Sequence, residues 1–209
     1  MPSRNVIKEF APGQYYHIYN RGVAKLPIFL DAQDKHVFLK ILRRHLDPHD
    51  KSLRDDGVVY RKFNTDIELL CYCLMGNHFH LLFYVKEDGD PNALSVFMQS
   101  AMTAYTMYFN KRHKRVGALF QGVFKASRIT NENYLTHITR YIHINPQTYK
   151  TYAHSSIGYY LGQKRSSWLN QDRVLAIFEG EDYSSFLEDY EEQKLIMEEI
   201  KSELANYRN

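Results

Sequence analysis

The chain has 209 residues, and its 44% hydrophobic content is enough for a proper core and excludes wholesale disorder. No apolar run approaches the roughly 20 residues of a membrane span, and the N-terminus lacks a signal-peptide core, so we expect a cytoplasmic protein with no membrane partner. Cys71 and Cys73 have a single residue between them, a poor geometry for a disulfide, and we expect buried thiols.

The net charge of +3 is unevenly distributed along the chain. Residues 179–209 hold ten acidic and three basic side chains, a balance of −7, which leaves +10 for residues 1–178. A body this basic favours a polyanionic partner, with nucleic acid first, although a solvated basic surface is the alternative. The basic side chains cluster at Arg43-Arg44, Arg61-Lys62, Lys111 to Arg115, and Lys125 with Arg128.

Apolar periodicity and turn residues predict alternating strands and helices. In chain order we expect a strand at 14–20, a helix at 33–46, an exposed loop at 48–64, strands at 66–75 and 78–85, a helix from Pro91, a strand at 123–130 and a helix at 132–145. Asn131 is the expected N-cap of the last helix, which Pro146 ends. This β-α-β-β-α-β-α order predicts an α+β fold, a ferredoxin-like split βαβ sheet with an added helix.

Two histidines occupy alternate positions of the expected strand at 78–85. Because side chains alternate between the faces of a strand, His78 and His80 point the same way while Phe79 points into a core. The two imidazoles lie roughly 7 Å apart along the strand and can jointly hold a divalent cation. Two strand histidines satisfied by ordinary hydrogen bonds are the competing interpretation.

The expected helix at 132–145 adds an amide and a phenol. Tyr141 and Asn145 are four residues apart, so their side chains emerge on one helical stripe about 6 Å apart along the axis. An amide oxygen there can complete an imidazole-based metal site. A tyrosine hydroxyl can attack a phosphate polarised by Mg²⁺ or Mn²⁺ and leave a covalent phosphotyrosine. A plain core or surface tyrosine is the alternative.

Six segments together resemble a known family: residues 19–22, 27–29, 75–82, 105–113, 119–125 and 140–146. They are similar to the IS200-like (Y1, single-tyrosine) transposases, most of all to the REP-associated branch, over about residues 14–162. Gly76 and Val123 stand where relatives often have proline and arginine. The turn tolerates the glycine, the valine removes one possible phosphate contact, and the chemistry is left intact.

The resemblance implies an HUH endonuclease with a ferredoxin-like catalytic domain over residues 1–162 and an acidic helical extension over 163–209. Such enzymes cut and rejoin single-stranded DNA beside a folded hairpin, through a 5′-phosphotyrosine and a divalent metal. By this resemblance His78, His80 and Asn145 are metal ligands and Tyr141 is the nucleophile. The family includes dimers that exchange the tyrosine helix and monomers, so a homodimer stays open. A domesticated, non-catalytic protein that binds DNA or RNA hairpins is the alternative.

Further side chains are candidates for supporting roles. Arg21 is a candidate phosphate clamp, His137 a candidate for proton transfer, and Tyr134 a rival nucleophile without an amide partner. His17, on the first expected strand, could point toward the metal or into the core, and we expect the core. The acidic extension either covers a basic groove or is a solvated helix pair. The candidate nucleic-acid contacts are Lys111, Arg112, Lys114, Arg115, Lys125 and Arg128, of which the first four can instead satisfy a helix macrodipole.

Overall fold

The structure, a computed structural model, describes residues 9–146, 148–180 and 182–188. Its main elements are β1 (Gln14–Arg21), α1 (Ala32–Leu46), β2 (Ile67–Leu74), β3 (His78–Val85), α2 (Ala93–Arg112), β4 (Lys125–Ile129) and α3 (Glu132–Ile144). Three short helices follow, α4 (Ile157–Tyr160), α5 (Asp172–Leu175) and α6 (Tyr183–Glu188). Every strand and long helix expected from the sequence is confirmed, with bounds shifted by a residue or two.

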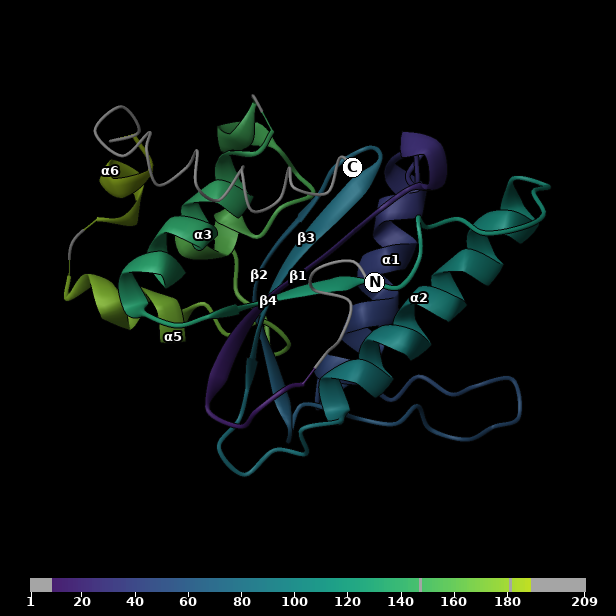
Figure 1. Ribbon diagram of the computed structural model, residues 1–209, viewed down its shortest axis with the longest axis horizontal. Helices are drawn as coiled ribbons and strands as arrows, with labels where there is room; N and C mark the ends of the chain where they lie inside the picture. The colour runs from purple at the N-terminus through teal and green to yellow at the C-terminus, as the bar shows by residue number, and fades with distance from the viewer. Residues whose placement is uncertain (1–8, 147, 181, 189–209) are drawn as a thin grey trace.

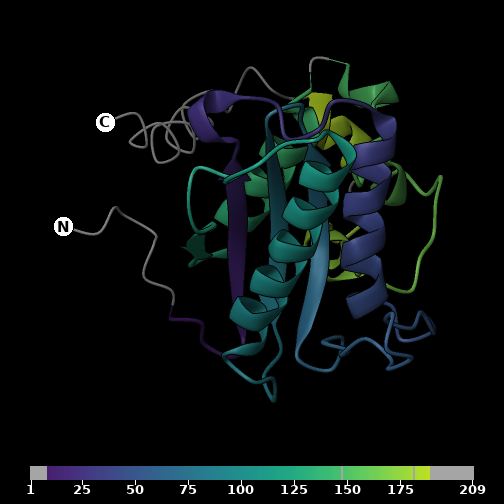
Figure 2. The same cartoon turned by 90° about the vertical axis from the view of Figure 1, so that its right-hand side faces the viewer.

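The four strands form one antiparallel sheet in the order β2-β3-β1-β4, which confirms the ferredoxin-like arrangement. Helices α1 and α2 cover one face of this sheet, and α3, with α5 and α6 beside it, covers the other (Figure 1). Figure 2 shows α1 and α2 side by side in front of the strands. No helix in the described ranges is long and apolar enough to cross a membrane.

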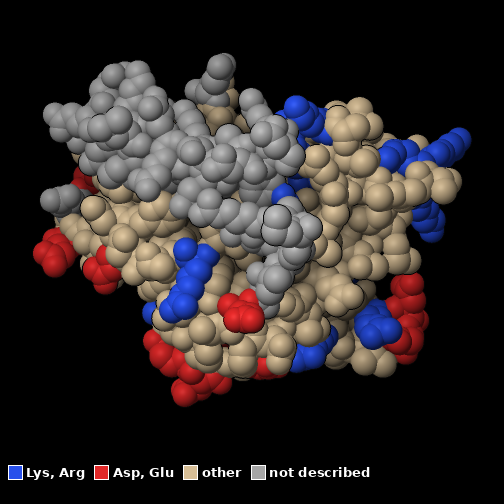
Figure 3. Space-filling view, in the orientation of Figure 1, with Lys and Arg blue, Asp and Glu red and all other residues tan. Residues whose placement is uncertain are grey.

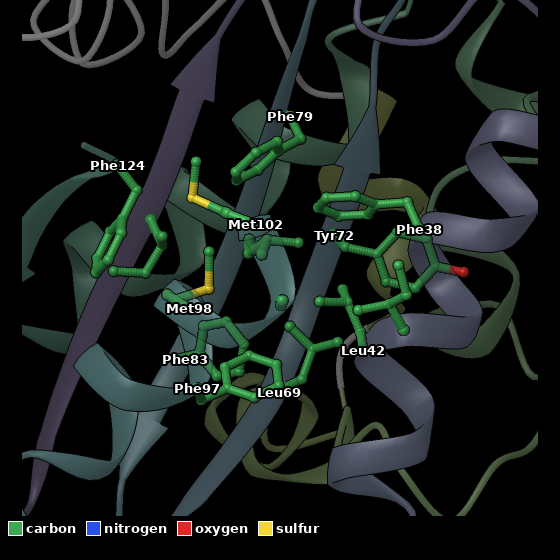
Figure 4. Packing of buried hydrophobic residues seen from close by; sticks show 14 of the residues in the cluster. Phe38, Leu42, Leu69, Tyr72, Phe79, Phe83, Phe97, Met98, Met102 and Phe124 are labelled. Atoms are coloured by element: carbon green, nitrogen blue, oxygen red, sulfur yellow. The ribbon is translucent and has the colours of Figure 1, made fainter. Parts of the chain in front are cut away.

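Each face of the sheet has its own hydrophobic core because side chains alternate along the strands. On β3, Phe79, Leu81 and Phe83 belong to the core under α1 and α2, while Leu82 and Tyr84 belong to the core under α3. Figure 4 shows the first core, in which the rings of β3 pack against side chains of α1 and α2. The even-numbered face of β3, which also carries His78 and His80, is therefore directed toward α3.

The described part of the C-terminal extension packs onto the body. Trp168 is buried in the first core and stacks on Tyr72, with ring centroids 5.8 Å apart. Val174, Phe178 and Tyr183 are buried in the second core beneath α3. The remainder of the acidic extension, residues 189–209, lies outside the described residues.

Cys71 and Cys73 are free, buried thiols on the face of β2 that packs under α3. Burial raises the pKa of the Cys73 thiol to about 12. Both thiols therefore remain protonated and inert near neutral pH, in line with their expected role as core residues.

Candidate active site

The pairing of β1 with β3 assembles the site at one end of the sheet. Arg21 lies opposite His78 and Tyr19 lies opposite His80, so these four side chains share the face toward α3. The rings of His78 and His80 are 5.1 Å apart between centroids. The spacing of two residues therefore produces the shared face that the sequence predicts.

His80 is only 4% exposed and is hydrogen-bonded through one ring nitrogen alone. Its Nδ1 lies 2.9 Å from Nε2 of His17, which projects from β1 onto the same face. Its Nε2 is buried and has no hydrogen-bond partner among the described residues. Burial lowers the pKa of His80 well below its ordinary value, and the charge of His17 would lower it further. The ring is therefore neutral near pH 7, with Nε2 directed into the site.

His78 is held in a similar way by a side chain of the turn before β3. Its Nδ1 lies 2.7 Å from Oδ1 of Asn77. Burial and then the nearby positive charge of Arg21 lower the pKa of His78 to about 4, while a hydrogen bond with Asn145 acts in the opposite direction. His78 is thus also neutral near pH 7, as a metal-binding imidazole must be.

Helix α3 delivers the phenol and the amide to this face. The side chain of Asn131 caps its first turn by accepting a hydrogen bond from the backbone of Tyr134, and Ile138 and Ile142 are fully buried against the sheet. This docking brings the Tyr141 ring to 5.4 Å from the His80 ring, edge to face. Burial raises the pKa of the Tyr141 phenol, and a hydrogen bond from Asn145 opposes the shift.

Asn145 is the C-cap residue of α3, and its side chain interacts with both His78 and Tyr141. The structure therefore gathers the two imidazoles, the amide and the phenol that the sequence singles out. In the described ranges no cluster of three or more histidine, cysteine or acidic side chains is arranged to hold a metal. A cation at this site would need the amide of Asn145, or water, beside the two imidazoles. The unpartnered Nε2 of buried His80 fits such a role, because a buried ring nitrogen without a partner is otherwise unfavourable.

Two cationic side chains lie on the site face. The Nε atom of Arg21 is buried and has no hydrogen-bond partner among the described residues. Lys125 lies opposite Tyr19 on β4, and partial burial lowers its pKa. Arg128 is three residues further along the same strand and so occupies the opposite face, where it donates hydrogen bonds to Gln14. Arg21 and Lys125, unlike Arg128, thus lie on the face of the sheet that is directed toward α3.

The basic cluster at the C-terminal end of α2 divides into two kinds of side chain. Arg112 forms ion pairs with Asp31 at 2.7 Å and with buried Asp34 at 2.5 Å. Its guanidinium is therefore engaged in joining α2 to the start of α1. Lys111 and Lys114 are exposed. Figure 3 shows a group of Lys and Arg side chains at the upper right, where α2 ends in the same view of Figure 1.

The two remaining candidates on α3 lie away from the imidazoles. The His137 ring packs against Phe186 of α6 at 5.9 Å, and burial followed by the charge of Arg140 lowers its pKa. Tyr134 packs against the second core. These contacts do not support proton transfer by His137 or nucleophilic attack by Tyr134, the two roles that the sequence left open.

Asn77 is the site residue that sequence reasoning missed, and for His17 it preferred the wrong one of two directions. His17 was expected in the core rather than toward the metal, but an odd-numbered residue of β1 shares the face of Tyr19 and meets His80 across the strand pair. The sequence indicates that His17 and Tyr19 share a face of the strand, because they are two residues apart. The β1–β3 register that joins His17 to His80 is not readable from the sequence.

Comparison with known proteins finds one matching family and similar folds. Residues 57–145, from the loop before β2 to the end of the Tyr141 helix, match the family described as Transposase IS200 like. A REP-associated tyrosine transposase solved bound to a REP hairpin is similar in structure, with a TM-score of 0.50, 16% identity, and coverage of 81% of this chain and 92% of that chain.

A protein of Deinococcus radiodurans, provisionally assigned as a transposase, matches with a TM-score of 0.40 and 15% identity over 68% of this chain and 95% of that one. No protein of curated function matches the sequence. Residues 57–145 are therefore similar to the IS200-like transposases, and the chain shares its fold with a REP-associated tyrosine transposase.

Proposed function

We propose that this protein is a metal-dependent endonuclease and strand transferase that cuts single-stranded DNA next to a hairpin. The observation that carries the proposal is the meeting of Tyr141 with His80, 5.4 Å apart between ring centroids, beside an amide that interacts with both Tyr141 and His78. A plain core tyrosine needs no such neighbours. The REP hairpin bound to the structural neighbour supports a hairpin partner.

In the proposed reaction the phenol oxygen of Tyr141 forms a bond to the scissile phosphorus while the bond from phosphorus to the 3′ oxygen breaks. The products are a 5′-phosphotyrosine and a free 3′ hydroxyl, and the proton lost by the phenol balances the one gained by the 3′ oxygen. The reverse attack by a 3′ hydroxyl rejoins a strand and releases the phenol.

His78, His80 and Asn145 would hold a divalent cation, Mg²⁺ or Mn²⁺. The chemistry that such a cation supplies is neutralisation of charge on the phosphate and orientation of the scissile bond. Asn145 also holds the phenol of Tyr141 on the site face, and Arg21 and Lys125 would bind the non-bridging phosphate oxygens. Burial of the imidazoles excludes water from the side opposite the substrate.

The test of the nucleophile is covalent attachment. The full-length protein is incubated with Mn²⁺ and a labelled pool of DNA hairpins whose single-stranded flanks are randomised, and adducts are separated on a denaturing gel. We expect an adduct with wild-type protein, its loss in Tyr141→Phe, and its retention in the matched control Tyr134→Phe. Attachment at wild-type level in Tyr141→Phe would overturn the assignment of Tyr141.

The second test separates chemistry from binding. We expect His78→Ala and His80→Ala to abolish cleavage while hairpin affinity changes little, because affinity depends on phosphate neutralisation by cations elsewhere. Cleavage and hairpin binding are measured on the same DNA. Salt-sensitive binding by wild-type protein, with no product in Mg²⁺ or Mn²⁺, would favour a non-catalytic hairpin-binding protein instead.

A further inference from the structure

We propose that Asn77 and His17 are positioning residues that keep the ring protons of His78 and His80 on Nδ1, so that Nε2 of each ring is left to bind a cation. This inference rests on the proposed function, because it concerns the side chains behind the two candidate metal ligands. Metal-binding imidazoles commonly depend on such partners at the other ring nitrogen.

The orientation of the Asn77 amide decides which nitrogen of His78 carries the proton. The Nδ2 group of Asn77 donates a hydrogen bond to the backbone carbonyl of Lys25 at 3.0 Å. The oxygen of the amide is therefore the atom that faces Nδ1 of His78 at 2.7 Å. An amide oxygen can only accept, so Nδ1 of His78 donates. A neutral imidazole has one N–H group, and Nε2 of His78 consequently keeps its lone pair.

The carbonyl of Lys25 is presented by an unusual turn. Ala24 and Lys25 have φ values of 51° and 62°, in the left-handed region that side chains other than glycine rarely adopt. The turn is closed by backbone hydrogen bonds from Lys25 to Gly22 and from Leu26 to Val23. Backbone strain of this kind is concentrated at functional sites, and here it supports the residue that orients His78.

His17 performs the same task for His80 from the neighbouring strand. The two buried rings are 2.9 Å apart between Nε2 of His17 and Nδ1 of His80, so they share one proton in that contact. For a cation to bind at Nε2 of His80, this proton must lie on Nδ1 of His80, with Nε2 of His17 as acceptor. The His17 ring stacks on the rings of Tyr19 and His80, with centroids 4.8 and 5.0 Å apart, and these contacts hold it in place.

The two contacts involve the same ring atom of each ligand histidine although they come from unrelated parts of the chain. Nδ1 of His78 faces the side chain of Asn77, and Nδ1 of His80 faces the ring of His17. A purely space-filling residue at position 17 would need no ring nitrogen. The matching contacts at His78 and His80 therefore point to orientation of the Nε2 atoms as their common effect.

The experiment measures Mn²⁺ binding to the full-length protein without DNA, by electron paramagnetic resonance of free Mn²⁺. We expect His17→Phe, which keeps a stacking ring, and Asn77→Leu to weaken Mn²⁺ binding about 10- to 100-fold. The conservative variants His17→Gln and Asn77→Asp, which restore an acceptor, should recover most of the affinity. The control His45→Phe removes another buried histidine, hydrogen-bonded to the Arg61 carbonyl away from the site, and should bind Mn²⁺ as wild-type protein does.

Nitrogen NMR of metal-free protein labelled in histidine reads the tautomers directly. We expect the proton of His78 and of His80 on Nδ1 in wild-type protein, and loss of this preference in Asn77→Leu and His17→Phe respectively. Unchanged Mn²⁺ affinity in both variants, or a proton on Nε2 of either ring in wild-type protein, would overturn the inference. Wild-type protein that keeps both Nδ1 protons but binds no Mn²⁺ would support the positioning and overturn the metal site of the proposed function.

Discussion

Burial makes the histidines of this protein a source of acid sensitivity. His143 on α3 is fully buried. Its Nδ1 lies 2.7 Å from the Tyr183 hydroxyl, and its Nε2 lies 2.7 Å from the Ser156 hydroxyl. Burial lowers its pKa from 6.5 to about 3. The unfolded chain therefore binds a proton below about pH 6.5 that the folded protein does not take up until about pH 3.

This difference predicts how the free energy of unfolding depends on pH. Stability contributed by the neutral His143 ring is present above pH 6.5 and is lost as the pH falls toward 3, at about 1.4 kcal/mol per pH unit for each such group. We expect His143→Gln to reduce the slope by about this amount, and His36→Gln, at an exposed position, to leave it unchanged. Urea unfolding between pH 4 and pH 7 measures the slope. Equal slopes in wild-type protein and His143→Gln would contradict the prediction.

At this scale the sequence predicts which residues share a face and misses which partners they meet. The spacing of His78 from His80, and of Tyr141 from Asn145, correctly predicts their common directions. Lys125 and Arg128 belong to one basic cluster in the sequence. They are three residues apart on β4, however, and therefore lie on opposite faces of the strand. The ion pair of Arg112 with Asp34 joins residues far apart in the sequence, and no local pattern indicates it.

The segment between β1 and α1 is the element that most constrains the site. It begins at Gly22, whose backbone donates a hydrogen bond to the Asn77 carbonyl, and the carbonyl of Gly76 accepts from Ile28 and Phe29. A Cβ atom at Gly22 would lie 2.0 Å from the carbonyl oxygen of Leu26. Because that oxygen belongs to backbone, it cannot move aside without opening the turn.

Gly22→Ala is therefore expected to destabilise the protein by about 1–3 kcal/mol, as strained or overpacked substitutions do. It should also weaken Mn²⁺ binding, because the turn carries the Lys25 carbonyl that orients Asn77. Gly76→Ala is the matched control on the facing turn, since a Cβ atom there meets nothing within 4 Å. Chemical denaturation and Mn²⁺ titration measure the two effects. Similar losses in both variants would show that close contact at Gly22 is not the cause.

The order and type of the elements could be predicted because each follows a local rule. The strands alternate between two cores, α3 begins at an Asn131 cap, and prolines lie next to the expected helix ends. The β-bulge between Leu69 and Cys71 was not predicted, because it depends on pairing with β3. The left-handed turn at Ala24 and Lys25 was also not predicted, because neither alanine nor lysine typically adopts such a conformation.

At the scale of the whole molecule, the connections bring one basic cluster to the site end of the sheet. Strand β3 runs away from His78, and α2 returns along the sheet, so that α2 ends at the same end of the molecule as the start of β3 (Figure 1). The chain beyond α2 then pairs with the end of β1, where Gln121 donates a backbone hydrogen bond to Arg21. Lys111 and Lys114 thus lie at the same end as the imidazoles, while the loop after α1, which contains Lys51, lies at the other end.

This arrangement predicts that charge near the site matters more for DNA binding than total charge. Replacing Lys111 and Lys114 together by glutamine should weaken binding of a labelled hairpin with a single-stranded flank, and lower the slope of log affinity against log salt by about 1.4 if each contacts one phosphate. The charge-matched control replaces Lys40 and Lys51, which are exposed on α1 and the loop after it, and should change neither quantity appreciably. Fluorescence anisotropy from 50 to 300 mM salt gives both slopes. Equal effects of the two double variants would mean that binding follows net charge, and that the end of α2 has no special part in holding the DNA.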